Sequence, residues 1–84
     1  MKPSAYSRKY AALRAWLKAK RQGLGLSLRD AGALVGRHHS VIGKLEQNRR
    51  RIDLAEFVEY CEALGLDPHE GLDVFMLSHG KSPS

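Results

Sequence analysis

The sequence predicts one all-α domain, on the basis of its length, its few β-branched residues and its helix start and stop signals. The chain has 84 residues, which allows one domain with one hydrophobic core. Its hydrophobic fraction of 43% and charged fraction of 27% are typical of a globular chain. Serine or aspartate precedes several segments with helical apolar spacing, and glycine or asparagine follows them. These signals divide the chain into five expected helices.

The first expected helix begins at Ser4 or Ser7 and ends before the glycines Gly23 and Gly25, which suit a left-handed helix end. Residues spaced three and four apart form its expected buried stripe, namely Tyr6, Tyr10, Ala12, Leu13, Trp16 and Leu17. Its other face is basic, with Arg8, Lys9, Arg14, Lys18, Lys20 and Arg21.

The second and third expected helices are short. Ser27 and Asp30 form a shortened capping box that begins a helix from Leu28 to Val35, and Gly36 ends it. The inward residues of this helix are expected to be Ala31, Leu34 and Val35. The third helix covers residues 39–47, with Val41 or Ile42 and Leu45 inward, and Asn48 can adopt the left-handed conformation that ends it.

The fourth and fifth expected helices follow a loop of three arginines. Asp53 and Asp67 are the expected N-caps, and Pro68 occupies the first helical position of the last helix. The fourth helix extends to Leu64, with an expected inward face of Leu54, Phe57, Val58, Cys61 and Leu64. The fifth extends to Ser78 and presents Leu72, Phe75 and Met76.

Several classes of protein are excluded by composition. No stretch approaches 18 consecutive apolar residues, which excludes a transmembrane helix. The first residues lack the apolar run of a secretory signal. Cys61 is the single cysteine, so no internal disulfide forms and a reducing cytoplasm is expected. Adjacent His38 and His39 lack the spacing of a zinc site, so no metal or other cofactor is expected.

Charge is divided unevenly along the chain. Residues 1–51 contain thirteen of the fourteen lysines and arginines beside two acidic residues, a formal charge of +11. Residues 52–84 contain one lysine beside seven acidic residues, a formal charge of −6. Such a dipole would orient the basic half towards a polyanion. The alternative is an uneven but merely solvated surface.

The segment from Ser27 to Gln47 has the pattern of a helix-turn-helix. Two short helices that cross steeply require a very small residue at the crossing, and Gly32 provides it. Ile42 and Leu45 are positioned to bury the rear of the second short helix. Its exposed front would then carry His38, His39, Ser40 and Lys44.

At these positions the sequence resembles the lambda repressor and Cro family of helix-turn-helix proteins, also called XRE-like. Residues 25–36 resemble the family's glycine, leucine, serine and alanine-rich pattern, and residues 40–48 resemble its recognition helix. The resemblance covers residues 10–66. It implies a compact five-helix fold and a structural ion pair between Arg21 and Glu46. Three positions depart from the pattern, namely Leu28, Ala31 and Gly43.

The resemblance also implies that two different groups of residues contact double-stranded DNA. His39, Ser40 and Lys44 would read bases in the major groove. Contacts to the DNA backbone or minor groove would come from Ser27, Leu28, Arg37, His38, Gln47, Arg49, Arg50 and Arg51. For Leu28, contact with a thymine methyl group, with solvent or with protein all remain open. We therefore divide the chain into an N-terminal arm (1–6), a helix-turn-helix domain (7–66), a C-terminal helix (67–78) and a flexible tail (79–84).

The expected function is that of a bacterial or phage transcription regulator, with repression as the expected action, in the cytoplasm or nucleoid. A homodimer would bind a pseudo-palindromic operator, with Leu72, Phe75 and Met76 as the dimer surface; alternatively these residues only complete the monomer core. The second hypothesis is an antitoxin that binds a toxin-like protein and regulates its own operon. An enzyme is not expected, because no nucleophile–base pair, phosphate loop or paired carboxylates occur. No aromatic strand motif indicates single-stranded RNA binding.

Overall fold

The computed structural model describes residues 4–77, and this part of the chain folds into helices without strands. The helices are α1 (Ser4–Gly23), α2 (Leu28–Val35), α3 (His39–Glu46), α4 (Leu54–Leu64) and α5 (Pro68–Leu77). The all-α prediction is therefore confirmed. Residues 4–6, which we expected in an N-terminal arm, form the first turn of α1. The predicted tail 79–84 lies outside the described residues.

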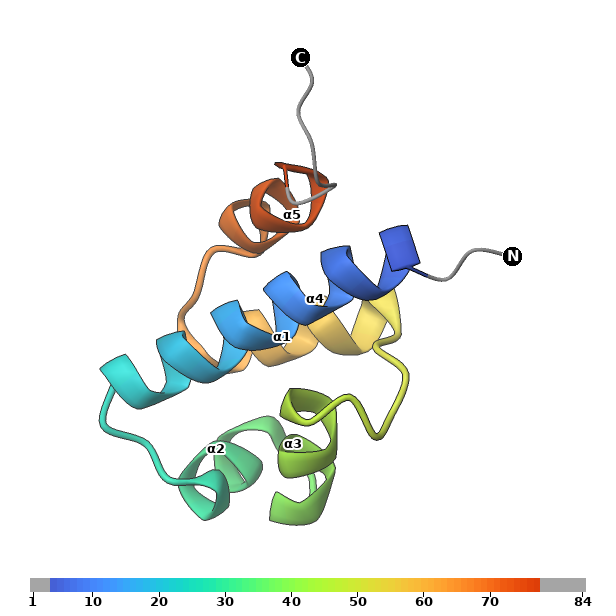
Figure 1. Ribbon diagram of the computed structural model, residues 1–84. Helices are drawn as coiled ribbons and strands as arrows, with labels where there is room; N and C mark the ends of the chain where they lie inside the picture. Colours follow the sequence, from blue (N-terminus) through green and yellow to red (C-terminus); the bar gives the residue numbers. More distant parts are fainter. Residues whose placement is uncertain (1–3, 78–84) are drawn as a thin grey trace.

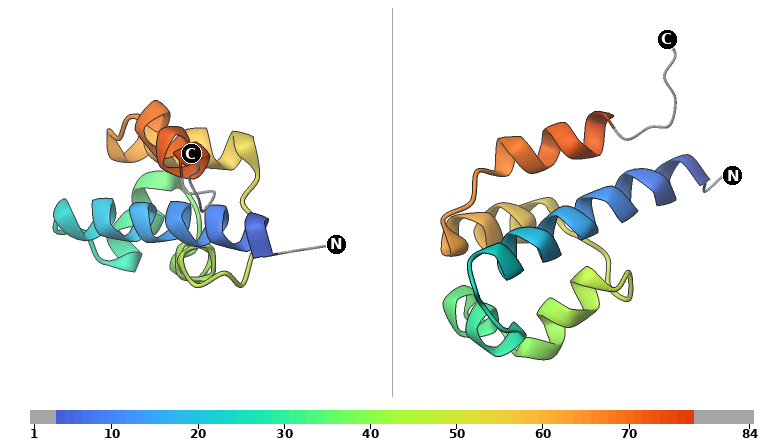
Figure 2. Two further views of the ribbon diagram at one scale, coloured as in Figure 1. Left: turned by 45° about the horizontal axis from the view of Figure 1, so that its top comes forward. Right: turned by 60° about the vertical axis from the view of Figure 1, so that its left-hand side comes forward.

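The helices are arranged in three layers (Figure 1). The pair α2 and α3 lies on one side of α1 and α4, and α5 lies on the other side. The second orientation in Figure 2 shows the same order, with α1 in contact with both α3 and α5. The two short helices thus form one outer layer of the molecule, in which α3 packs against α1 and α2 packs against α4. Among the described residues, no helix is long and apolar enough to span a membrane.

The helix boundaries follow the predicted capping signals. Ser27 and Asp30 form a reciprocal capping box at the start of α2. The Asp53 side chain accepts a hydrogen bond from the backbone N–H of Glu56 at the start of α4. Gly36 ends α2 with a φ of 81°, and Asn48, with a φ of 61°, follows α3 in the predicted left-handed conformation. Each of these signals acts over a few residues, so each could be read from the sequence.

The crossing of α2 and α3 depends on Gly32. A Cβ atom at this position would lie 2.6 Å from the carbonyl oxygen of Arg37 and 3.1 Å from the backbone of His39. Those distances are too short for a side chain, and backbone has little freedom to move away. The prediction of a very small residue at the crossing is confirmed, and the close approach fixes the angle at which α3 leaves the turn.

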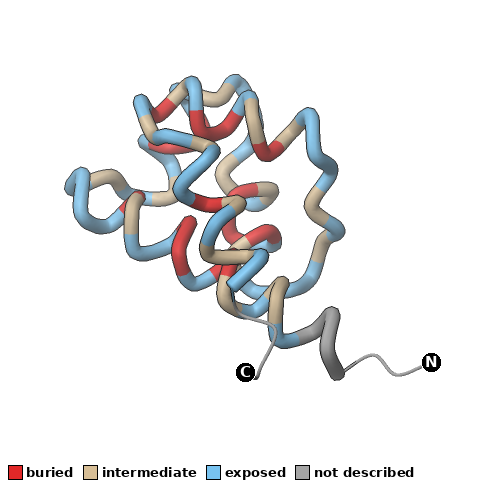
Figure 3. The backbone as a smooth tube through the Cα atoms, turned by 90° about the horizontal axis from the view of Figure 1, so that it is seen from above, coloured by how far each residue is buried: buried red, intermediate tan, exposed pale blue. Residues whose placement is uncertain are grey.

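The hydrophobic core lies between the helices, where buried segments of the backbone face one another (Figure 3). Its buried members are Leu13, Trp16, Leu17, Ala31, Ile42, Phe57, Tyr60, Cys61 and Leu64. Cys61 is fully buried, as expected for a small core residue, and burial raises the pKa of its thiol to about 11. Ala31 is also fully buried.

Three predictions about the core are wrong. Leu34 and Leu54 were expected to face inward and are exposed. Leu34 lies outside the inward face of α2, which is formed by Leu28, Ala31, Gly32 and Val35. Leu54 is the first residue of α4, at the edge of the core. Arg14, expected on the basic outer face of α1, is buried.

Tyr60 was not among the expected core residues, yet it is one of the largest fully buried side chains. Its spacing of three from Phe57 and four from Leu64 places it on the same helix face. That spacing was visible in the sequence. Burial raises the pKa of the Tyr60 phenol, which therefore remains neutral.

The packing of α5 against α1 combines polar and aromatic contacts. The indole N–H of Trp16 donates a hydrogen bond of 3.0 Å to Glu70, and the Lys20 ammonium lies 2.9 Å from the same carboxylate oxygen. The hydrogen bond from Trp16 and, to a smaller extent, the one from Lys20 lower the pKa of Glu70. The Phe75 ring meets the Tyr10 ring edge to face, with centroids 5.0 Å apart. The C-terminal helix is thus part of the folded domain.

We expect Gly43→Ala to raise the free energy of unfolding by about 0.5–1 kcal/mol, because alanine loses less backbone entropy in a helix. A Cβ at Gly43 would meet only Leu28 Cδ1 at 3.5 Å and Gln47 Nε2 at 3.9 Å, which are ordinary contacts. Urea unfolding followed by circular dichroism measures the change. The matched control is Gly32→Ala, expected to lower stability by about 1–3 kcal/mol; equal effects of the two variants would contradict the crossing geometry.

Candidate nucleic-acid interface

The position of α3 is set by a buried ion pair with α1. Arg21 Nε lies 2.6 Å from Glu46 Oε2, and Arg21 Nη2 lies 2.9 Å from Glu46 Oε1. The two side chains are only 8% and 4% exposed. Arg21 also donates a hydrogen bond of 2.8 Å to the carbonyl oxygen of Leu26, in the loop before α2. One guanidinium therefore joins α1, the end of α3 and the start of the helix-turn-helix, and its hydrogen bonds to Glu46 raise the pKa of Arg21.

A second arginine of α1 holds the same end of α3. The Nη1 atom of buried Arg14 donates a hydrogen bond to the carbonyl oxygen of Leu45. The last carbonyl groups of a helix lack partners within it, so this contact caps the C-terminus of α3 with a cation. Sequence reasoning missed this role. The available signal was the spacing of seven between Arg14 and Arg21, which places both on one face of α1.

The beginning of α3 is capped by His38. Its Nδ1 atom accepts a hydrogen bond of 3.1 Å from the backbone N–H of Ser40 and lies 2.8 Å from the Ser40 hydroxyl. An imidazole can accept at Nδ1 only while that nitrogen is unprotonated. Of the residues expected at the base-reading front, Ser40 thus already has a partner within the protein.

The other two residues of the expected reading set differ in exposure. Lys44 is exposed on α3, whereas His39 is half-buried and its ring lies 4.3 Å from that of His38. Desolvation, with smaller electrostatic effects from His38 and Arg29, lowers the pKa of His39. A neutral imidazole can both donate and accept a hydrogen bond. The front of α3 therefore presents an exposed lysine and a half-buried imidazole.

Leu28, whose contacts the sequence left open, packs against the protein. The side chain is half-buried against the core, and its Cδ1 atom lies 3.5 Å from the Cβ position of Gly43. Leu28 therefore lies beside Gly43 on α3 and leaves room there for a methyl group. Ser27, beside it, has its hydroxyl in the capping box of α2.

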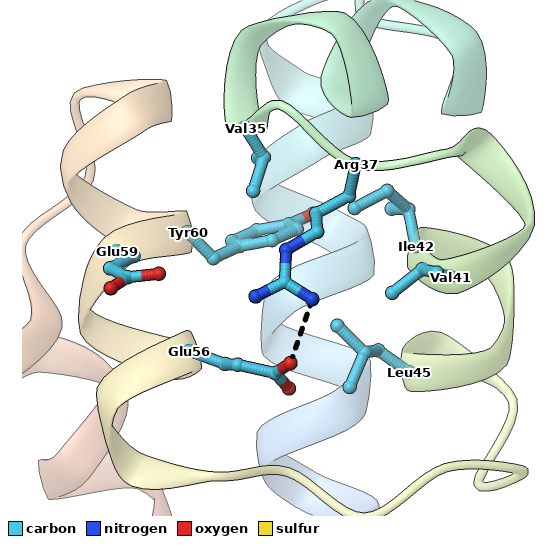
Figure 4. Close-up of a pocket in the computed structure, with 8 residues that line it drawn as sticks. All are labelled: Val35, Arg37, Val41, Ile42, Leu45, Glu56, Glu59 and Tyr60. Atoms are coloured by element: carbon cyan, nitrogen blue, oxygen red, sulfur yellow. Dashed lines mark ion pairs between the residues drawn. The ribbon is translucent and has the colours of Figure 1, made fainter.

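The arginines expected at the DNA backbone fall into two groups. Arg49 and Arg51 are exposed, as is Gln47 at the end of α3. Arg37 and Arg50 instead form ion pairs with Glu56 in the first turn of α4, at 3.1 and 2.7 Å. Figure 4 shows the Arg37 side chain pointing from the turn before α3 towards this carboxylate.

Sequence reasoning did not assign Glu56 any partner. The residue was visible only as the acidic member of the capping sequence that begins α4. Its pairing with Arg37 crosses from the α2–α3 turn to α4, so no local spacing indicates it. A small pocket next to this ion pair is lined by Val35, Arg37, Val41, Ile42, Leu45, Glu56, Glu59 and Tyr60.

The expected dimer surface is divided between core and exterior. Leu72 and Phe75 are half-buried and pack against the core, whereas Met76 is 61% exposed. A pocket of about 130 Å³ opens beside them, lined by Tyr10, Leu13, Ile52, Leu54, Phe57, Leu72 and Phe75. Leu54, which lines this pocket, is itself exposed.

Comparisons with known proteins agree with this geometry. A family model described as helix-turn-helix matches residues 17–70. Among solved structures, an XRE-family like protein from Pseudomonas syringae pv. tomato str. DC3000 is similar, with a TM-score of 0.81 and 30% sequence identity over 87% of this chain and 89% of that chain. No curated protein matches the chain. The residues matched by the family model include α2, α3 and both members of the Arg21–Glu46 pair.

We expect Glu46→Ala to lower the free energy of unfolding by about 3–5 kcal/mol, because it leaves the Arg21 guanidinium buried without its partner. Chemical unfolding followed by circular dichroism measures the loss. The control replaces both residues, Arg21→Met with Glu46→Leu, and should recover most of the stability. A double variant as unstable as the single one would show that the ion pair is not the source of the effect.

Proposed function

The chain belongs to the XRE-type helix-turn-helix family of DNA-binding transcription regulators, and from this premise we propose that it is a repressor that binds a pseudo-palindromic operator as a dimer. The observation that carries the proposal is the rigid attachment of α3. Its C-terminal end is held by Arg14 and Arg21, and its front is left polar and accessible. A helix held in this way can enter the major groove without losing its orientation.

Base reading is proposed for His39, Ser40 and Lys44. Lys44 has the strongest chemistry, because an ammonium donates to the O6 and N7 atoms of guanine. His39 and Ser40 discriminate less, since each can donate or accept. Ser40 would have to exchange its contact with His38 for a base, so we assign the largest share of specificity to Lys44.

Contacts to the DNA backbone are proposed for exposed Arg49 and Arg51 and for Gln47. Arg37 and Arg50 are proposed to add further contacts of the same kind. The N-termini of α2 and α3, at Ser27 and His38, would add oriented N–H groups. These contacts position the protein without reading sequence, and they make binding depend on salt. The formal charge of +11 on residues 1–51 favours the approach of this half to DNA.

Dimerisation is proposed through α5. Met76 is exposed, and Leu72 and Phe75 line the apolar pocket beside it. Two copies joined here would present two α3 helices to half-sites about one helical turn, ~34 Å, apart. Doubling the contacts raises specificity, which a single eight-residue helix supplies poorly.

We expect selection from a random duplex pool at about 150 mM salt to enrich one motif with inverted half-sites, because that salt concentration suppresses non-specific attraction. The spacing of the half-sites then measures the dimer geometry. Enrichment of a single half-site would contradict the dimer. Failure to enrich any motif would contradict sequence-specific binding and would favour a protein-binding role of the antitoxin type.

We expect Lys44→Ala to lower discrimination at one base position by about 1–3 kcal/mol. Arg51→Ala should instead weaken binding to all sequences alike and flatten the dependence of log affinity on log salt by about one unit. Fluorescence anisotropy on the selected motif and its single-base variants separates the two effects. Identical profiles for the two variants would show that the division between reading and positioning residues is wrong.

A further inference from the structure

One carboxylate oxygen of Glu56 holds two arginines from the two sides of α3. Glu56 Oε2 lies 3.1 Å from Arg37 Nη1 and 2.7 Å from Arg50 Nη2. Arg37 precedes α3 in the turn, Arg50 follows it in the loop, and Glu56 belongs to α4. The Glu56 side chain is 18% exposed, whereas those of the arginines are 40% and 37% exposed. The two arginine side chains are therefore more exposed than the carboxylate that neutralises them.

Two guanidinium groups that converge on one oxygen anion form a site whose chemistry suits phosphate. Arginine binds phosphate and carboxylate oxygens through the same charge-assisted hydrogen bonds. A phosphodiester carries one negative charge, like Glu56, and can replace it without changing the charge of the site. The carboxylate thus occupies the position at which an external oxyanion would bind.

The closed arrangement leaves one donor of Arg50 unsatisfied. Arg50 Nε is buried and has no hydrogen-bond partner within the part of the chain that the structure describes. A buried donor without an acceptor is unfavourable. A phosphate, with several oxygens, can accept from more than one nitrogen of a guanidinium. Once the Arg50 side chain leaves Glu56 and its Nε becomes accessible, a phosphate supplies the acceptor that this nitrogen lacks.

We propose that Glu56 is an internal competitor for the DNA backbone: it holds Arg37 and Arg50 in the free protein, and a phosphate of the bound duplex displaces it. This inference rests on the proposed function and adds an internal ion pair that lowers the affinity for DNA. A phosphate that takes the place of Glu56 on these two arginines must first break an ion pair within the protein. Glu56 thereby lowers the affinity that the basic half would otherwise have for any duplex.

The competitor role differs from a purely structural one in the sign of its effect on binding. If the Glu56 carboxylate only joins the two loops to α4, its removal should lower the affinity for DNA or leave it unchanged. If the carboxylate competes with DNA phosphates, its removal should raise the affinity for DNA. Glu59, three residues later on α4, is exposed and supplies a control with the same change in charge.

The test compares wild type, Glu56→Gln and Glu59→Gln, all as the full chain, by fluorescence anisotropy with a random-sequence duplex from about 50 to 300 mM salt. We expect Glu56→Gln to bind about fivefold more tightly at about 150 mM salt and to steepen the dependence of log affinity on log salt by about one unit. Glu59→Gln should change neither quantity by a comparable amount.

A second pair of variants assigns the gain to the two arginines. Adding Glu56→Gln to the double variant Arg37→Gln and Arg50→Gln should produce no gain in affinity. The proposal is overturned if Glu56→Gln binds no more tightly than Glu59→Gln, or if its gain persists without the two arginines. If Glu56→Gln fails to fold by circular dichroism, Glu56→Asp, which withdraws the carboxylate by one methylene group, takes its place, with Glu59→Asp as its control and a gain in affinity again expected for the Glu56 variant alone.

Failure of the proposed function gives a different result. If wild type binds operator and random duplex equally, sequence-specific regulation is wrong, while the competitor role is still decided by the variants. If wild type binds no duplex at about 50 mM salt and Glu56→Gln does, the competitor role holds. If neither protein binds, both proposals are overturned.

Discussion

The buried pair of Arg21 and Glu46 is the interaction on which the DNA-facing half of the molecule depends. Helices of eight residues, such as α2 and α3, are not stable alone in water. Their position must therefore come from contacts with longer elements. Arg21 provides one contact to α3 and another to the loop before α2, and removing its partner would leave a charge without compensation in the interior. The pair thus fixes the location of α3 on α1 as well as contributing to stability.

Both ends of α3 are held by contacts outside the helix itself. At its start, His38 provides the cap and Gly32 allows the backbone of α2 to approach. At its end, Arg14 and Arg21 bind the last turn. These contacts use backbone groups and the rear of the helix, so they leave Lys44 exposed. Rigid support at the rear and free polar groups in front are the combination that sequence reading in a groove requires.

Two acidic residues of the second half of the chain, Glu70 and Glu56, join different layers of the fold. Glu70 binds Trp16 and Lys20 and so joins α5 to α1, on the side away from α2 and α3. Glu56 of α4 binds Arg37 and Arg50, the two arginines that flank α3 on the other side of the molecule. The uneven charge along the sequence is therefore partly neutralised in the folded molecule. The folded domain presents fewer free cations to DNA than the sequence count indicates.

The sequence by itself determined the helices, the caps of α2 and α4, the crossing glycine and the family, because each of these depends on residues only a few positions apart or on a local motif. It did not indicate that His38 caps α3. Ser27 with Asp30, Gly36 and Asn48 act through neighbouring backbone groups, and their signals do not require knowledge of the fold. Only the tertiary structure decided that Arg14 is buried, that Leu34 is exposed and that Glu56 pairs with Arg37. These outcomes depend on which helix faces lie opposite each other, since a charged side chain is accommodated in the interior only where a distant element supplies its partner.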